Sequence, residues 1–207
     1  MHSEALTKEG KAILPLLAAF AGFYLVGGTG LSLHIGHRIS VDFDMFTEKP
    51  LQKELFSKAK GVFKPFSVVL TYRSPEQINL IVSGVKITFF HFSYPVIDPL
   101  TSYLGVNIAS IKEIAAMKAF SIGKRLAYKD YVDWYFLLSE QHTSLANVIA
   151  HAKKKFGADF NDRLFLGHLA SFSDVPTQTI DFLRNEVQRT AIKRYLAGAI
   201  KSFRWQS

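Results

Sequence analysis

The sequence contains no cysteine among its 207 residues. This absence excludes disulfide bonds, catalysis by a thiolate and zinc sites with cysteine ligands. It also fits a cytoplasmic protein, because disulfides are rare where thiols are kept reduced. The chemistry of the chain must therefore come from its carboxylates, hydroxyls, histidines and basic side chains.

The sequence also lacks a hydrophobic run long enough to span a membrane. The only candidate, residues 12–26, is shorter than the roughly 20 residues of a spanning helix, and Pro15 and Gly22 interrupt it. A secretory signal would need a basic start and a small-residue cleavage site followed by a mature domain, whereas this segment runs directly into a glycine turn. We therefore expect this segment to lie in a buried core, and we expect no membrane partner.

The composition indicates a folded domain with a preference for anionic partners. Hydrophobic residues make up 48% of the chain and charged residues 20%, which is enough apolar surface for a packed core. The net charge of +8 and the pI of about 9.6 favour nucleotides or RNA as partners. Many ordinary soluble proteins share this balance, so the charge is only a weak indication.

Strand-like and helix-like segments alternate in the first half, and helical patterns fill the second half. The expected strands are residues 23–26, 41–46, 66–72, 78–82 and 85–92, with a hairpin turn at Ser83-Gly84. The expected helices are residues 3–20, 31–35, 51–62, 110–122, 128–140, 145–156, 159–170 and 177–203. This order predicts an α+β fold, with a sheet domain over residues 1–105 and a helical domain over residues 106–207.

A pair of carboxylates lies on one of the expected strands. Residues two apart on a strand point to the same face, so Asp42 and Asp44 project together with their bases about 6 to 7 Å apart. Phe43 and Met45 would face the core. At this spacing two carboxylates can share divalent cations that clamp a triphosphate. The alternative is an edge strand whose aspartates are simply solvated.

A glycine turn, Gly27-Gly28-Thr29, precedes this strand and follows another. Glycines let backbone N–H groups approach a ligand closely, and the next helix directs its positive end toward an anion. Thr29 could cap the helix or bind a phosphate oxygen. Arg38 could meet phosphate charge or pair with the acidic strand, and Ser40 would share the face of Asp42. The alternative is a plain strand-to-helix turn.

Two histidines and one lysine also stand out. His34 and His37 are three residues apart, but Gly36 is expected to end the helix between them, which favours a structural role over a metal pair. Lys118 falls on the apolar stripe of the helix over residues 110–122, where lysine is rarely buried unless paired. It could snorkel to water or reach a phosphate. On the following helix, Lys129 and Asp133 could form a surface pair.

The spacing of these motifs resembles that of a known family. The shared positions are Gly27-Gly28-Thr29, Leu31, Leu33, His37-Arg38, Ser40, Asp42, Asp44 and Phe46. Together they resemble the opening signature of AbiEii/AbiGii-type nucleotidyltransferases, which are toxins of abortive-infection and related toxin–antitoxin systems. Ala116-Met117-Lys118 and Lys129-Asp130-Tyr131-x-Asp133 are similar to the downstream motifs of that family. The resemblance spans about residues 20 to 138.

The resemblance implies a polymerase-β-like nucleotidyltransferase core, a mixed sheet with flanking helices, followed by a helical C-terminal domain. It implies that Gly27, Gly28 and Thr29 hold an NTP, and that Asp42 and Asp44 bind Mg²⁺ or Mn²⁺. It further implies that Ser40 supports the site, that Lys118 contacts phosphate, and that Asp130 is a base or an added acidic ligand. Such enzymes usually take a third carboxylate from a neighbouring strand, but residues 85–92 contain no acid, and we expect Thr88 at that position.

The resemblance implies metal-dependent transfer of a nucleotidyl group from an NTP to RNA, with tRNA as one candidate, or to protein. The lysines of Lys153-Lys154-Lys155 and the basic C-terminal helix are compatible with an RNA acceptor. A cognate antitoxin would be a further partner. Two alternatives remain open, a degenerate module of the same fold that binds a nucleotide or a partner without chemistry, and kinase-like transfer of the γ-phosphoryl group.

Overall fold

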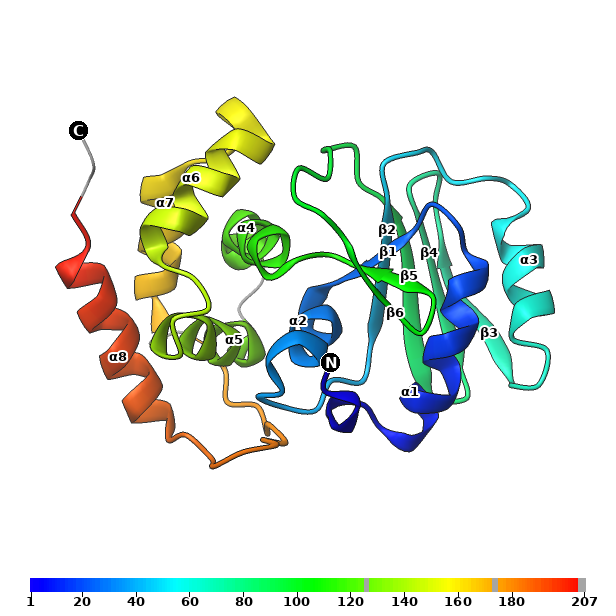
Figure 1. Ribbon diagram of the computed structural model, residues 1–207, viewed down its shortest axis with the longest axis horizontal. Helices are drawn as coiled ribbons and strands as arrows, with labels where there is room; N and C mark the ends of the chain where they lie inside the picture. Colours follow the sequence, from blue (N-terminus) through cyan, green and yellow to red (C-terminus); the bar gives the residue numbers. More distant parts are fainter. Residues whose placement is uncertain (125–126, 173–174, 205–207) are drawn as a thin grey trace. The chain divides into compact units, whose positions relative to one another are not determined.

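The computed structural model describes residues 1–124, 127–172 and 175–204. The chain forms two compact units, Met1–Ser110 and Ile111–Ser207. The first unit contains a sheet with helices, and the second contains only helices among its described residues (Figure 1). The predicted α+β class, with a sheet followed by a helical part, is confirmed.

The sheet is mixed and has seven strands in the order β3-β4-β5-β2-β1-β7-β6. The strands are β1 (Tyr24–Val26), β2 (Phe43–Thr47), β3 (Val68–Arg73), β4 (Gln77–Val82), β5 (Val85–His91), β6 (Thr101–Tyr103) and β7 (Val106–Ile108). The pairs β2–β5 and β1–β7 are parallel, and the other pairs are antiparallel. The predicted hairpin turn at Ser83-Gly84 joins β4 to β5, and both residues have the positive φ that such a turn requires.

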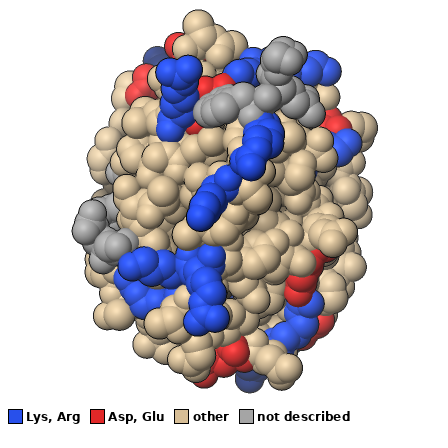
Figure 2. Space-filling model, turned by 90° about the vertical axis from the view of Figure 1, so that its left-hand side faces the viewer, with Lys and Arg blue, Asp and Glu red and all other residues tan. Residues whose placement is uncertain are grey.

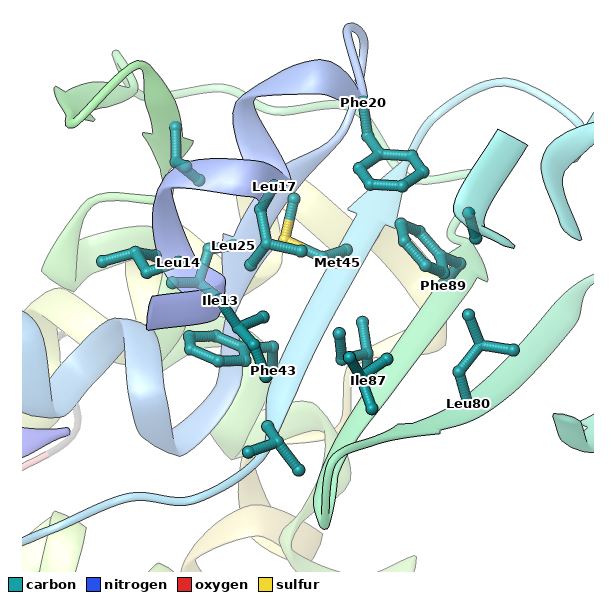
Figure 3. Close-up of a cluster of buried hydrophobic side chains, with 14 of the residues drawn as sticks. Ile13, Leu14, Leu17, Phe20, Leu25, Phe43, Met45, Leu80, Ile87 and Phe89 are labelled. Carbon is teal, nitrogen blue, oxygen red and sulfur yellow. The ribbon is translucent and has the colours of Figure 1, made fainter. Parts of the chain in front are cut away.

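One face of the sheet carries the core of the first unit (Figure 3). Alternate residues of β2 and β5 project into it, and Phe43, Met45, Ile87 and Phe89 are at most 1% exposed. The helices of this unit are η1 (Ser3–Ala5), α1 (Lys8–Ile13), η2 (Leu14–Ala19), α2 (Gly27–Ile35) and α3 (Leu55–Val62). Side chains from α1, η2 and α3 complete the core, among them Ile13, Leu14, Leu17, Leu55 and Ala59.

The apolar segment over residues 12–26 lies in this core, as predicted. Leu17 and Leu25 are buried, and the ring of Phe20 lies 4.7 Å from that of Phe89. No helix among the described residues is long and apolar enough to cross a membrane.

The single helix predicted over residues 3–20 is wrong, because the chain breaks into three short helices there. Leu6 is extended and forms a parallel bridge with Ser40. Thr7 then starts α1 by accepting a hydrogen bond from the Gly10 N–H at 3.1 Å. Pro15 lies in the first turn of η2 and prevents a continuous α-helix through this point. A contact with a distant segment therefore overrides the local helical pattern.

The second unit contains the helices α4 (Ile111–Ser121), η3 (Ile122–Lys124), α5 (Tyr128–Ser139), α6 (Leu145–Phe156), η4 (Gly157–Asp159), α7 (Asp162–Ala170) and α8 (Arg189–Ser202). The helix predicted over residues 177–203 is too long, since α8 begins only at Arg189. Residues 177–188 precede this helix, and two of their side chains contact α5 and the residue after it. Arg184 donates two hydrogen bonds to the Glu140 carboxylate, at 2.8 and 3.1 Å, and the Phe182 ring lies 6.2 Å from that of Phe136.

The division between the units lies after Ser110, five residues beyond the predicted boundary of 105/106. The difference arises from the hairpin of β6 and β7, two strands of three residues each. Leu25 of β1 pairs with Ile108 of β7, so that residues 106–108 belong to the sheet.

Candidate active site

The glycines after β1 form the first turn of α2 and not a separate turn before it. Val26 ends β1 and α2 begins at Gly27, which has φ +69°. A Cβ atom built on Gly27 would lie 2.3 Å from Asp44 Oδ2, and one built on Gly28 would lie 2.5 Å from Arg38 Nη2. Gly27 has the positive φ that favours glycine, and at both positions the end of a charged side chain lies close to the backbone.

The two aspartates lie where the sequence predicts, on the face of β2 opposite the core. Asp42 immediately precedes β2, and Asp44 pairs with Val26 at the end of β1. Phe43 and Met45 point into the core as expected, at 1% and 0% exposure. Asp42 and Asp44 are half-buried. Carboxylate oxygens are suited to Mg²⁺ or Mn²⁺, and these two side chains remain open to solvent, so they fit the implied cation.

The hydroxyl of Thr29 connects α2 to the segment that leads into β2. Thr29 is 1% exposed, and its Oγ1 lies 2.8 Å from Ser40 Oγ and hydrogen-bonds the main-chain carbonyl of Asp42. The Ser40 N–H in turn donates to the Ala5 carbonyl at 2.9 Å. These contacts fix the position of Asp42 relative to the start of α2. That Thr29 also binds phosphate stays a prediction.

Arg38 is buried beside the glycines, at 4% exposure. Its Nη1 donates to the Ile39 carbonyl at 3.1 Å, and its Nη2 lies over Gly28. The guanidinium therefore adds positive charge at the N-terminal end of α2, where the helix dipole already favours an anion.

His34 and His37 lie on either side of the residue that ends α2. Gly36 ends α2 between them with φ +61°, as predicted, and the Nε2 of His34 lies 2.8 Å from the Ala109 carbonyl. Burial lowers the pKa of His34, against the opposing effect of that hydrogen bond. Within residues 1–124, 127–172 and 175–204, no group of three or more His, Cys, Asp and Glu side chains is placed to hold a metal. The candidate ligands are the two aspartates.

Thr88 lies beside Asp44, at the position where the family resemblance implies a third carboxylate. Asp44 pairs with Thr88 across the parallel strands β2 and β5, and Thr88 pairs with Asn79 on β4. A carboxylate, a hydroxyl and an amide thus follow one another across the sheet. Any further acid must come from another part of the chain.

Lys118 and Asp130, the candidates of the second unit, are brought together there. Lys118 Nζ lies 3.0 Å from Asp130 Oδ1 and 2.5 Å from Asp133 Oδ2. All three residues are buried, at 6%, 5% and 0% exposure. The interpretation of Asp133 as part of a surface pair with Lys129 is wrong. Asp130 and Asp133 are three residues apart on α5, a spacing that places them on one face and could have revealed the cluster.

Several basic side chains of the second unit are buried or contact other groups of the protein, although the sequence suggested that they could bind RNA. Lys155 is buried, with its Nζ 2.7 Å from the equally buried Glu113 carboxylate, and Lys153 lies 2.5 Å from Asp162. Arg189 lies over the rings of Tyr128 and Phe172. The exposed cations of α8 and the residues after it are Lys193, Arg194, Lys201 and Arg204. Figure 2 shows a face of the molecule on which Lys and Arg side chains extend across the middle, while Asp and Glu lie nearer the margins.

Two solved structures of other proteins share the fold of this chain. MenT4, the nucleotidyltransferase toxin Rv2826c from Mycobacterium tuberculosis H37Rv, superposes with a TM-score of 0.59 at 14% identity, covering 93% of this chain and 81% of that one. JHP933 from Helicobacter pylori superposes with a TM-score of 0.53 at 18% identity, covering 97% and 90%. At these identities the likeness is one of fold.

Comparison of sequences identifies the family. The uncharacterized protein aq_aa25 of Aquifex aeolicus (strain VF5) is 33% identical over 185 residues, which cover 84% of this chain and 88% of that protein. The family model described as nucleotidyl transferase AbiEii toxin, type IV TA system, matches residues 11–89 and 77–205. The chain therefore belongs to the AbiEii nucleotidyltransferase toxin family and is a nucleotidyltransferase.

Proposed function

We propose that this toxin nucleotidyltransferase uses Mg²⁺ or Mn²⁺ to transfer a nucleotidyl group from an NTP to RNA, with tRNA as the candidate acceptor. One observation carries the proposal, the approach of the Asp44 carboxylate to the backbone of Gly27 where α2 begins. This proximity supports a single site in which the candidate metal ligands lie beside a helix end suited to anions. We place the reaction in the cytoplasm, with a cognate antitoxin protein as a further partner.

In this proposal, different residues of the first unit bind the cation and the phosphates of the nucleotide. Asp42 and Asp44 would hold the cation, which when bound neutralises the triphosphate and the charge that develops in transfer. The N–H groups of Gly27 and Gly28 and the guanidinium of Arg38 supply positive charge for the phosphates. Thr29 and Ser40 keep the Asp42 segment in place through their hydrogen bonds.

In the proposed reaction an acceptor hydroxyl oxygen forms a bond to the α-phosphorus. The bond from that phosphorus to the pyrophosphate oxygen breaks, and pyrophosphate leaves. The hydroxyl proton passes to a base, for which Asp130 is the candidate, and Lys118 is the candidate for a phosphate contact. Because these two side chains also pair with each other, their roles in chemistry and in stability have to be measured separately.

The acceptor is proposed from charge. Residues 187–207 contain five Lys and Arg and no Asp or Glu, and Lys193, Arg194, Lys201 and Arg204 are exposed. Such a run attracts the phosphates of a nucleic acid in a salt-dependent manner. An RNA acceptor is therefore favoured over a protein.

The proposal is tested by incubating the protein with each NTP, labelled at the α- or the γ-phosphate, together with total tRNA and Mg²⁺. We expect α-label on the RNA, loss of transfer on chelation, and a fall of at least about 100-fold for Asp44→Asn. Transfer of γ-label alone would indicate kinase chemistry. NTP binding without any transfer would indicate the non-catalytic module, which the threonine at position 88 favours.

Induced expression in bacteria tests the toxin role separately. The native protein should slow growth, and Asp42→Ala or Asp44→Ala should not, at equal protein levels. Equal toxicity of the native and substituted proteins would exclude the proposed site.

A further inference from the structure

Aromatic side chains continue the face of the sheet that carries the aspartates. Phe46 follows Asp44 by two residues on β2, and Phe90 follows Thr88 by two residues on β5, so all four share the face opposite the core. Phe46 and Phe90 are paired in the register of these strands, and their ring centroids are 5.0 Å apart. The Phe92 ring lies 5.4 Å from Phe46 and 6.3 Å from Phe90.

This aromatic group is separate from the core of the first unit. Neither Phe46 nor Phe90 belongs to the buried cluster on the other face or packs against it. Both are half-buried, whereas their neighbours Met45 and Phe89 are fully buried. Partly exposed phenyl rings offer apolar faces on which a flat ring can stack.

Two amide side chains border the same aromatic pair. Gln77 pairs with Phe90 and Asn79 pairs with Thr88 along β4 and β5. The Nε2 of Gln77 donates to the Oδ1 of Asn79 at 2.8 Å. The pair retains an acceptor oxygen on Gln77 and donor hydrogens on Asn79, which are the groups that read the hydrogen-bonding edge of a base.

We propose that Phe46 and Phe90 form a stacking platform for a nucleobase, whose edge is read by Gln77 and Asn79. This inference rests on the proposed function and extends it to the recognition of the base. The platform lies about 7 Å along the strands from Asp44 and Thr88. That separation is comparable to the span of the ribose that joins a base to its α-phosphate. The base can belong to the NTP or to the end of the acceptor RNA.

Binding measurements test the platform independently of turnover. Calorimetry in Mg²⁺ would compare the native protein with Phe46→Leu/Phe90→Leu, using each NTP and ribose 5-triphosphate, which has no base. We expect the substitution to weaken NTP binding by about tenfold or more while leaving ribose 5-triphosphate unchanged. The control is Phe56→Leu, a half-buried phenylalanine of α3, which should change neither.

Kinetics separate the two sources of the base. A raised KM for the NTP assigns the platform to the incoming nucleotide, and a raised KM for RNA alone assigns it to the acceptor. Gln77→Ala and Asn79→Ala should then alter the preference among bases by about fivefold. Unchanged binding and KM in the phenylalanine variant, or equal weakening of NTP and ribose 5-triphosphate, would overturn the platform. A failed proposed function would instead appear as absent transfer by the native protein.

Discussion

Two pairs of aspartates, one in each unit, differ in how the protein accommodates their charge. Asp130 and Asp133 lie one helical turn apart on α5, are buried, and share the ammonium group of Lys118 at 3.0 and 2.5 Å. Asp42 and Asp44 lie two residues apart beside β2, are half-buried, and approach a glycine backbone. The helical pair is buried around one ammonium group of its own unit, while the sheet pair keeps part of its surface exposed to solvent.

The difference indicates which pair of aspartates contributes less to the stability of the fold. A buried carboxylate is tolerated only with a partner, so Asp130 and Asp133 are tied to Lys118. A half-buried carboxylate keeps part of its hydration and depends less on a protein partner. The sheet pair can therefore serve chemistry, and the helical pair must first stabilise its unit.

The largest expected effect follows from removing the Lys118 ammonium group that Asp130 and Asp133 share. Lys118→Met should lower the free energy of unfolding by about 3–5 kcal/mol, because it leaves two carboxylates buried without their ammonium partner. Urea denaturation would measure this loss, with Lys154→Met as the control at an exposed lysine of α6. Equal stability of the two variants would remove the contrast between the aspartate pairs. Transfer assayed well below the melting temperature would then report any phosphate contact of Lys118.

A smaller effect is expected where the sheet pair meets the backbone. Gly27→Ala should cost about 1–3 kcal/mol, because φ is +69° and the new Cβ would lie 2.3 Å from Asp44 Oδ2. It should also displace the carboxylate and reduce transfer in the same assay. The matched control is Gly61→Ala in α3, where no atom lies within 4 Å of an added Cβ. That variant should be neutral or slightly stabilising, and a similar loss in both would show that Asp44 does not restrict position 27.

The smallest effect is expected at the hydroxyl that positions Asp42. Thr29→Val keeps the shape of the side chain but removes its hydrogen bonds to Ser40 and the Asp42 carbonyl, so stability should fall by about 1 kcal/mol. Thermal denaturation would measure this, and the KM for the NTP would report any shift of Asp42. Ser32→Ala, also buried in α2, is the control. Its hydroxyl has no hydrogen-bond partner among the described residues, so its removal should cost little.

Much of the fold could be predicted because the decisive signals are local. The predicted helix over residues 145–156 coincides with α6, which Ser144 caps through the Asn147 N–H. The alternation around Asp42 and Asp44 correctly placed Phe43 and Met45 in the core. The short strands β6 and β7 escaped prediction because three residues are too few to establish a period. The break after residue 5 depends on a bridge to Ser40, which no local pattern records.

The candidate site was predicted less evenly than the fold. Spacing identified the glycines and aspartates, but it could not reveal that the Asp44 carboxylate lies against Gly27 or that Thr29 bonds the Asp42 carbonyl. Lys155 and Asp133 look like surface charges in the sequence, and both are buried with partners on α4. Such pairing depends on which helices are neighbours, which is settled only by packing.

The parallel pairing of β1 with β7 also constrains the order in which the protein can fold. The Ala109 N–H donates to the Leu25 carbonyl at 2.9 Å, so a strand near the start of the chain is completed by residues near the end of the first unit. During synthesis, one edge of β1 stays unpaired until this later segment emerges from the ribosome. Contacts between such distant residues slow folding and leave an open strand edge in the interval. The first turn of α2, which directly follows β1, therefore stays next to an unpaired strand edge until β7 has been made.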